Sequence, residues 1–187
     1  GVGAATLLGR PATGTVGLPP AAVLPSAAPA PASIAPLPSV APVAPAVPAV
    51  PPAALSALRQ STTINQRLLA DAELLSQAMA ATSPAATDIA PLLRSLAATA
   101  SFGDRAATTV GTWDDAALVA KDLGAFYASI DRIAGEGLSA SLNNARAYRD
   151  AGRRMLAVLA GVTDLDAASR GLAATVDVEL PPLVPAS

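Results

Sequence analysis

The chain has 187 residues, a formal net charge of −2, and neither cysteine nor histidine. The missing residue types exclude thiol nucleophiles, metal sites built from Cys or His, and the most common general base. Nucleic acid is not expected as the main partner, because neutralising phosphates requires clustered Lys and Arg in clear excess of acids. We therefore expect a protein that is not an enzyme and that uses no cofactor and no metal.

The first 52 residues differ in composition from the rest of the chain. They contain 13 of the 18 prolines, and Arg10 is the only charged side chain before Arg59. Proline restricts φ and favours polyproline II, a helix with three residues per turn. The prolines that recur with this period are Pro42, Pro45, Pro48 and Pro51. We predict an extended Pro/Ala/Val-rich arm or linker over residues 1–52.

The arm also carries apolar side chains that an ordinary disordered linker lacks. Val40, Val43, Val47 and Val50 are the clearest examples. Two interpretations stay open: a solvated linker, or a strap that lies along a partner or along the protein's own helices. The second makes these valines candidate partner-binding residues.

No membrane span is expected in the uncharged N-terminal region, because proline interrupts it every few residues. Residues 1–8 are apolar but too short to span, and they lack the basic start of a signal peptide. The absence of cysteine is compatible with export. The expected location is extracytoplasmic, in the periplasm, in the cell envelope or secreted, with a position close to a membrane or envelope as a possibility.

Helical periodicity begins after the arm. Apolar residues at steps of three and four predict a first helix over residues 53–81. Two leucine pairs, at 68–69 and at 74–75, make its apolar arc broad. An uncovered arc would suit a coat on a membrane or a hydrophobic granule, but burial by other helices is the simpler expectation.

The second predicted helix starts at Ser83-Pro84, an N-cap followed by proline at the first helical position. It ends near Phe102-Gly103. Pro91 lies inside this range and should kink or split the helix.

Three further helices follow. The third starts at residues 112–115, where a hydroxyl and two carboxylates resemble a capping box, and stops at residues 135–137. The fourth starts at Ser139 or Ser141 and runs to Gly161. The fifth is capped by Thr163-Asp164 and runs to about residue 175.

These elements predict an all-α fold: a bundle of four to five antiparallel helices, preceded by the polyproline II-type arm. The expected domains are the arm at 1–52, the helical bundle at 53–180 and a C-terminal tail at 181–187. Strand signals are confined to the short alternation at residues 176–178.

Three arginines of the fourth helix are candidates for binding a partner. Arg146, Arg149 and Arg153 recur at steps of three and four, so they share one face. The functional interpretation is a site for phosphate, an acidic polymer or a partner's carboxylates. The alternative, which we favour here, is a solvated face balanced by Asp150 and by acids of a neighbouring helix.

Trp113 is a candidate exposed anchor for a partner, because it lies at a helix start after a Gly-containing turn. The acid pairs at 114–115 and at 164 and 166 are assigned to helix starts rather than to acid-base chemistry.

The sequence thus predicts a non-catalytic structural or assembly subunit. Its bundle would be attached through the apolar arm to a protein partner in a larger complex, envelope or filament. The alternative is an exported helical binding module for a lipid or another apolar ligand.

Overall fold

The computed structural model describes residues 50–184, and residues 1–49 and 185–187 lie outside the described part. The described part forms five α-helices and one short 3₁₀ helix, with no strand. The α-helices are α1 (Pro52–Ala80), α2 (Ala86–Val110), α3 (Ala117–Leu138), α4 (Ala145–Leu159) and α5 (Val162–Ala174). The all-α class is confirmed for this part of the chain, while the predicted polyproline II arm falls almost wholly outside it.

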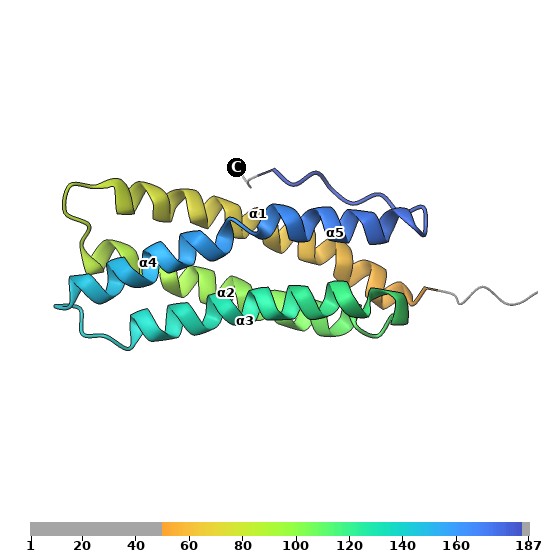
Figure 1. The fold of residues 1–187 in the computed structure, drawn as a ribbon, viewed down its shortest axis with the longest axis horizontal. Coiled ribbons are helices and arrows are strands. Elements are labelled where there is room, and N and C mark those ends of the chain that lie inside the picture. Colours follow the sequence, from red (N-terminus) through yellow and green to blue (C-terminus); the bar gives the residue numbers. More distant parts are fainter. Residues whose placement is uncertain (1–49, 185–187) are drawn as a thin grey trace, which may run out of the picture. The chain divides into compact units, whose positions relative to one another are not determined.

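The helices pack as a bundle with four positions. α1, α2 and α3 lie side by side in alternating directions, and α4 and α5 follow each other along the fourth position (Figure 1). Only Ala160 and Gly161 separate these two helices. The helical bundle is therefore confirmed, and the fourth and fifth predicted helices share one position in it.

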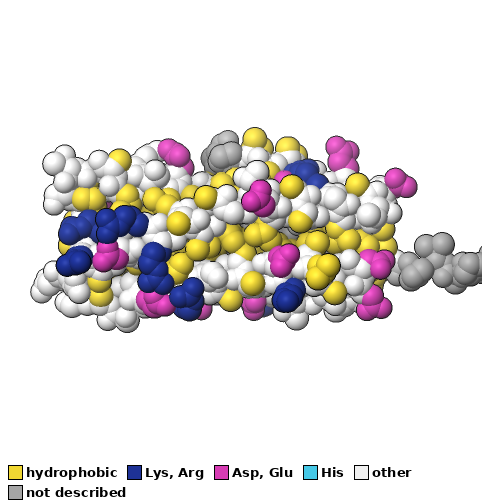
Figure 2. All heavy atoms as spheres, in the orientation of Figure 1, with side chains coloured by type: hydrophobic (Ala, Val, Ile, Leu, Met, Phe, Trp, Pro, Cys, Tyr) yellow, Lys and Arg dark blue, Asp and Glu magenta, His cyan; other side chains and the backbone are white. Residues whose placement is uncertain are grey.

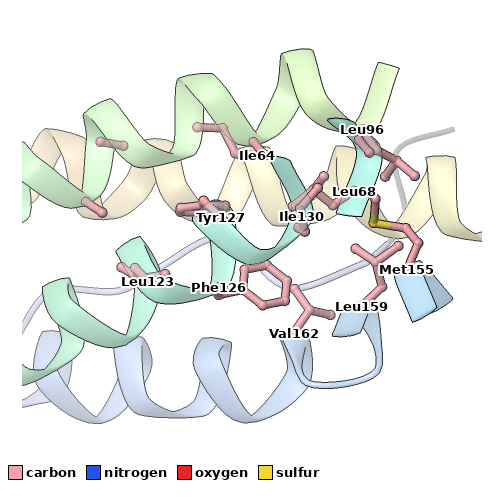
Figure 3. Packing of buried hydrophobic residues seen from close by; sticks show 14 of the residues in the cluster. Ile64, Leu68, Leu96, Leu123, Phe126, Tyr127, Ile130, Met155, Leu159 and Val162 are labelled. Atoms are coloured by element: carbon pink, nitrogen blue, oxygen red, sulfur yellow. The ribbon is translucent and has the colours of Figure 1, made fainter. Parts of the chain in front are cut away.

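The core runs along the bundle between the four positions. It is filled mainly by Leu, Ile and Ala, and two of its four aromatic side chains, Phe126 and Tyr127, lie on α3. Phe126 and Tyr127 meet edge to face, with ring centroids 5.5 Å apart. Figure 3 shows Phe126 pointing towards Val162 of α5, with Leu159 of α4 close by. The α4–α5 position is thus joined to α3 through the same apolar cluster.

One polar contact crosses this core. The Tyr127 hydroxyl of α3 donates a hydrogen bond to Oδ1 of Asn65 on α1, at 2.9 Å. Both side chains are buried, and burial raises the pKa of Tyr127 above its ordinary value. The contact fixes α3 against α1 at one register, because an unpaired amide oxygen here would be costly.

The predicted end of the second helix at Gly103 is wrong, because α2 continues to Val110. Gly103 is buried within the helix, and a Cβ atom at this position would lie 2.5 Å from the ring of Tyr127. The glycine is explained by the close approach of α3, not by helix termination. Sequence alone does not distinguish these two uses of glycine.

The predicted start of this helix at Ser83 is also wrong. The N-cap is Ala85, with no side-chain cap, and α2 begins at Ala86. Pro91 does not split the helix: it lies within its second turn, where its side chain is exposed. Near a helix start, a proline removes one N–H but leaves the rest of the helix intact.

The boundaries around α3 and α4 differ from prediction because hydroxyl groups expected to cap a following helix donate to carbonyls of the preceding turn instead. The hydroxyl of Thr112 donates to the carbonyl of Thr109 instead of capping the next helix. α3 passes through Gly135 and Gly137 to Leu138, and the Ser139 hydroxyl donates back to Glu136. α4 then begins at Ala145, where Oδ1 of Asn144 accepts from the Ala147 amide at 3.2 Å.

Candidate interaction surfaces

Arginines gather on α4 and on the adjoining end of α3. We name this region the α4 surface and define it by Arg132, Glu136, Arg146, Arg149, Asp150, Arg153 and Arg154. Figure 2, in the same orientation as Figure 1, shows basic side chains collected at the end of the bundle where α4 begins. The acidic side chains in this view are spread more widely.

Two of the predicted arginines meet at Asp150. Nε of Arg146 lies 3.9 Å from Oδ2 of Asp150, and Arg153 donates a hydrogen bond to Oδ1 of the same carboxylate. The side chains of Arg146 and Arg153 are 87% and 69% exposed. The pairing with Asp150 that the sequence suggested is therefore present, and both guanidinium groups remain open to solvent.

The third predicted arginine takes a different direction. Nη1 of Arg149 donates to the carbonyl of Pro84, in the connection between α1 and α2, at 3.5 Å. Arg149 is partly buried. It thus contacts the α1–α2 connection, whereas Arg146 and Arg153 converge on a carboxylate.

A second carboxylate pairs with two other arginines of the α4 surface; the sequence indicated acids of a neighbouring helix here but did not identify which one. Glu136 of α3 lies 2.6 Å from Nη1 of Arg154 on α4 and 3.1 Å from Nη1 of Arg132 on its own helix. The hydrogen bond from Arg154 is the main cause that lowers the pKa of Glu136. The spacing of Arg132 and Glu136 was visible in the sequence, but the contact with Arg154 needs the packing of α3 against α4.

Trp113 does not provide the exposed anchor that the sequence suggested. Its side chain is 5% exposed and belongs to the core cluster, just before the 3₁₀ helix Asp114–Ala116. The turn after α2 directs the indole inwards, where a large apolar ring is most stable. In the described chain, Trp113 closes this end of the core.

Only one of the four candidate valines of the arm lies within the described residues. Val40, Val43 and Val47 lie outside the described residues, whereas Val50 is partly buried and packs against the core. Val50 therefore serves the bundle itself.

An apolar groove that the sequence did not predict lies between α1 and α2. Its volume is about 440 Å³, and its lining residues are Gln60, Thr63, Ile64, Arg67, Ser95, Ala98, Thr99 and Phe102. Phe102 is 54% exposed, with the guanidinium of Arg105 4.6 Å from its ring centroid. The sequence could not show this groove, because it forms only where α1 packs against α2.

A cluster on α5, which we name the clasp, holds the C-terminal segment. Asp166 and Arg170 form an ion pair with an N–O distance of 2.6 Å, and Arg170 also donates to the carbonyls of Leu180 and Pro181. Nε2 of Gln66 on α1 donates to the carbonyl of Pro182 at 2.7 Å. Residues 180–182 are thus fastened to both α1 and α5, and the side chain of Leu180 is buried.

Three of the four paired acids, Asp114, Asp115 and Asp164, lie in the first turn of a helix, as predicted, and Asp166 does not. Asp114 and Asp115 open the 3₁₀ helix and are exposed, whereas Asp166 is committed to the clasp. Within residues 50–184, no group of three or more acidic side chains is arranged to hold a metal ion.

Comparison with known proteins identifies no relative: no family model matches the chain, and neither curated proteins nor solved structures give a match. Among the described helices, none is both long enough and apolar enough to cross a membrane.

Proposed function

We propose that this chain is a non-catalytic structural or assembly subunit. In this proposal the helical bundle is a rigid head, and the arm at residues 1–52 attaches it to a protein partner in a larger complex, envelope or filament. An extracytoplasmic location belongs to the same proposal.

The observation that carries the proposal is the self-contained packing of the bundle. Its core is filled by side chains from residues 50–184, and every buried side-chain nitrogen or oxygen in this range has a hydrogen-bond partner. In this proposal residues 1–49 are free to bind a partner, while Val50 packs against the core of the head. The arm's apolar valines then have a use in binding a partner, because burying them there is favourable.

The test compares two sets of substitutions in the full chain. Val40, Val43 and Val47 are changed together to Ser, and the matched control changes Ala41, Ala44 and Ala46 to Ser. The measurement is the share of tagged protein that elutes in a large assembly from its own host. We expect the valine variant to move to the size of the free chain, since it loses more apolar contact area than the control. A valine variant that stays in the assembly, or a wild-type chain that elutes free, contradicts the proposal.

A second candidate function is a binding module for a lipid or another apolar ligand, and the α1–α2 groove favours it. A volume of about 440 Å³ lies within the range of small-molecule sites, and Ile64 and Phe102 supply apolar walls. Native mass spectrometry of the protein from its host should then retain a small molecule, and Ala98→Trp, which fills the groove, should lose it. A wild-type protein that consistently carries no ligand removes this candidate.

A further inference from the structure

The α4 surface concentrates positive charge on a chain that is acidic overall. α4 carries four arginines and one aspartate, although the whole chain has a net charge of −2. Attraction to an anionic partner would therefore be local and would orient the bundle, with α4 facing the partner.

Four of the five arginines of this surface contact a carboxylate within the chain itself. Asp150 is shared by Arg146 and Arg153, and Glu136 is shared by Arg132 and Arg154. Each pair of guanidinium groups thus has a carboxylate between its members, which limits the rotamer freedom that binding would otherwise remove. A guanidinium has five N–H donors, so pairing with one carboxylate leaves others for a second anion.

The connection before α4 adds an apolar element. Residues 139–144 read SASLNN and contain no charge, and Leu142 among them is 53% exposed. A half-exposed leucine next to a basic helix fits a bilayer interface, where apolar side chains enter and arginines contact the headgroups.

We propose that the α4 surface binds the phosphate groups of anionic phospholipids, with Leu142 entering the interface. The bundle then lies on the membrane surface through α4. Guanidinium forks match phosphate oxygens, and the attraction is strongest where several arginines face an anionic leaflet. This role is independent of the arm's role in assembly.

The experiment measures co-sedimentation of the full chain with vesicles. One set contains phosphatidylcholine with about 30% phosphatidylglycerol, and the other contains phosphatidylcholine alone. The test variant is Arg146→Gln with Arg153→Gln. The matched control is Arg59→Gln with Lys121→Gln, which removes the same charge from two exposed positions outside the α4 surface.

We expect wild type to bind the anionic vesicles and not the neutral ones. Binding should weaken when salt rises from about 0.05 M to about 0.5 M. The test variant should lose roughly tenfold or more in partitioning, and the control less than about threefold. Leu142→Ser as a single change should also lower binding to the anionic vesicles, compared with wild type. Equal binding by the test variant and wild type, or equal binding to both vesicle types, overturns the proposal.

Two further probes separate lipid from other anions. Inorganic phosphate and poly-glutamate are titrated into the full chain by calorimetry. Binding of either probe with no vesicle binding shows a free-anion site or a site for an acidic protein, and it overturns the assignment to lipid. Vesicle binding that excess inorganic phosphate does not abolish supports it, because multivalent contact with a surface exceeds contact with single ions.

Discussion

The clasp and the α4 surface both contain an ion pair between an arginine and an aspartate four residues apart on one helix. Asp166 and Arg170 are four residues apart, as are Arg146 and Asp150. Yet the side chain of Asp166 is 7% exposed, whereas that of Arg146 is 87% exposed. In the clasp, Arg170 donates hydrogen bonds to two carbonyls of the C-terminal segment, and Gln66 donates to a third. On the α4 surface the charges remain available to a partner.

This difference shows that burial determines what an ion pair does. A pair in water contributes little to stability, because solvent screens it and its side chains lose freedom. A buried carboxylate has lost its contact with water, and its ion-pair partner compensates for that loss. Removing either member of a buried pair therefore lowers the stability of the fold. The two regions therefore predict different responses to the same kind of substitution.

The largest effect is expected in the clasp. Asp166→Asn should lower the free energy of unfolding by about 2 kcal/mol, because Arg170 loses its charged partner in a partly buried position. Chemical denaturation of the full chain measures this. Asp150→Asn is the matched control on the α4 surface and should change stability by no more than about 0.5 kcal/mol. Equal losses in the two variants would remove the distinction between the regions.

A smaller effect is expected for the uncharged contact in the core. Tyr127→Phe removes the hydroxyl that pairs with Asn65 and should cost about 1–2 kcal/mol, since the amide oxygen stays buried without a partner. Denaturation curves again give the value. The double variant Tyr127→Phe with Asn65→Leu should recover part of the loss, because no unpaired polar group remains. If Tyr127→Phe alone were as stable as wild type, burial would not explain the large stability loss expected in the clasp, and its charge would.

The smallest effect is expected at Glu136, and it depends on pH. Its folded pKa is lowered from 4.5, mainly by the hydrogen bond from Arg154. A lowered carboxyl pKa stabilises the fold at pH values above the unfolded pKa, and this contribution is lost as the pH falls through the folded pKa. Glu136→Gln should therefore be slightly less stable than wild type at neutral pH, and its stability curve should be flatter below pH 4.5, so that the two proteins converge in acid. A variant whose acid side runs parallel to wild type would contradict the role of Arg154.

Much of the helical architecture could be predicted from the residues themselves. The first helix was expected over residues 53–81 and is found as Pro52–Ala80, because its apolar positions recur at helical steps. The spacing of Arg146, Asp150 and Arg153 also indicated their contacts, since neighbours on one helix need no tertiary information.

Two of the wrong predictions, at Gly103 and at Trp113, share a physical reason, which is a contact with another part of the fold. Gly103 and Ser83 carry strong boundary signals, yet α2 passes through the first and begins after the second. The ring of Tyr127 explains the glycine, and Tyr127 lies on another helix. The prediction for Trp113 was wrong for the same reason: its position after a turn suggested exposure, whereas packing in the core buries it.

By itself, the sequence determined the all-α class and the helix order of the described residues, and it showed that a charge-poor, proline-rich composition ends near residue 52. Periodicity and composition are local properties, so they need no knowledge of the fold. Tertiary structure decided that α4 and α5 share one position, that Glu136 joins the α4 surface through Arg154, and that α1 and α2 form a groove. Each of these depends on which helix faces which, and that choice is made by the packing of the whole core.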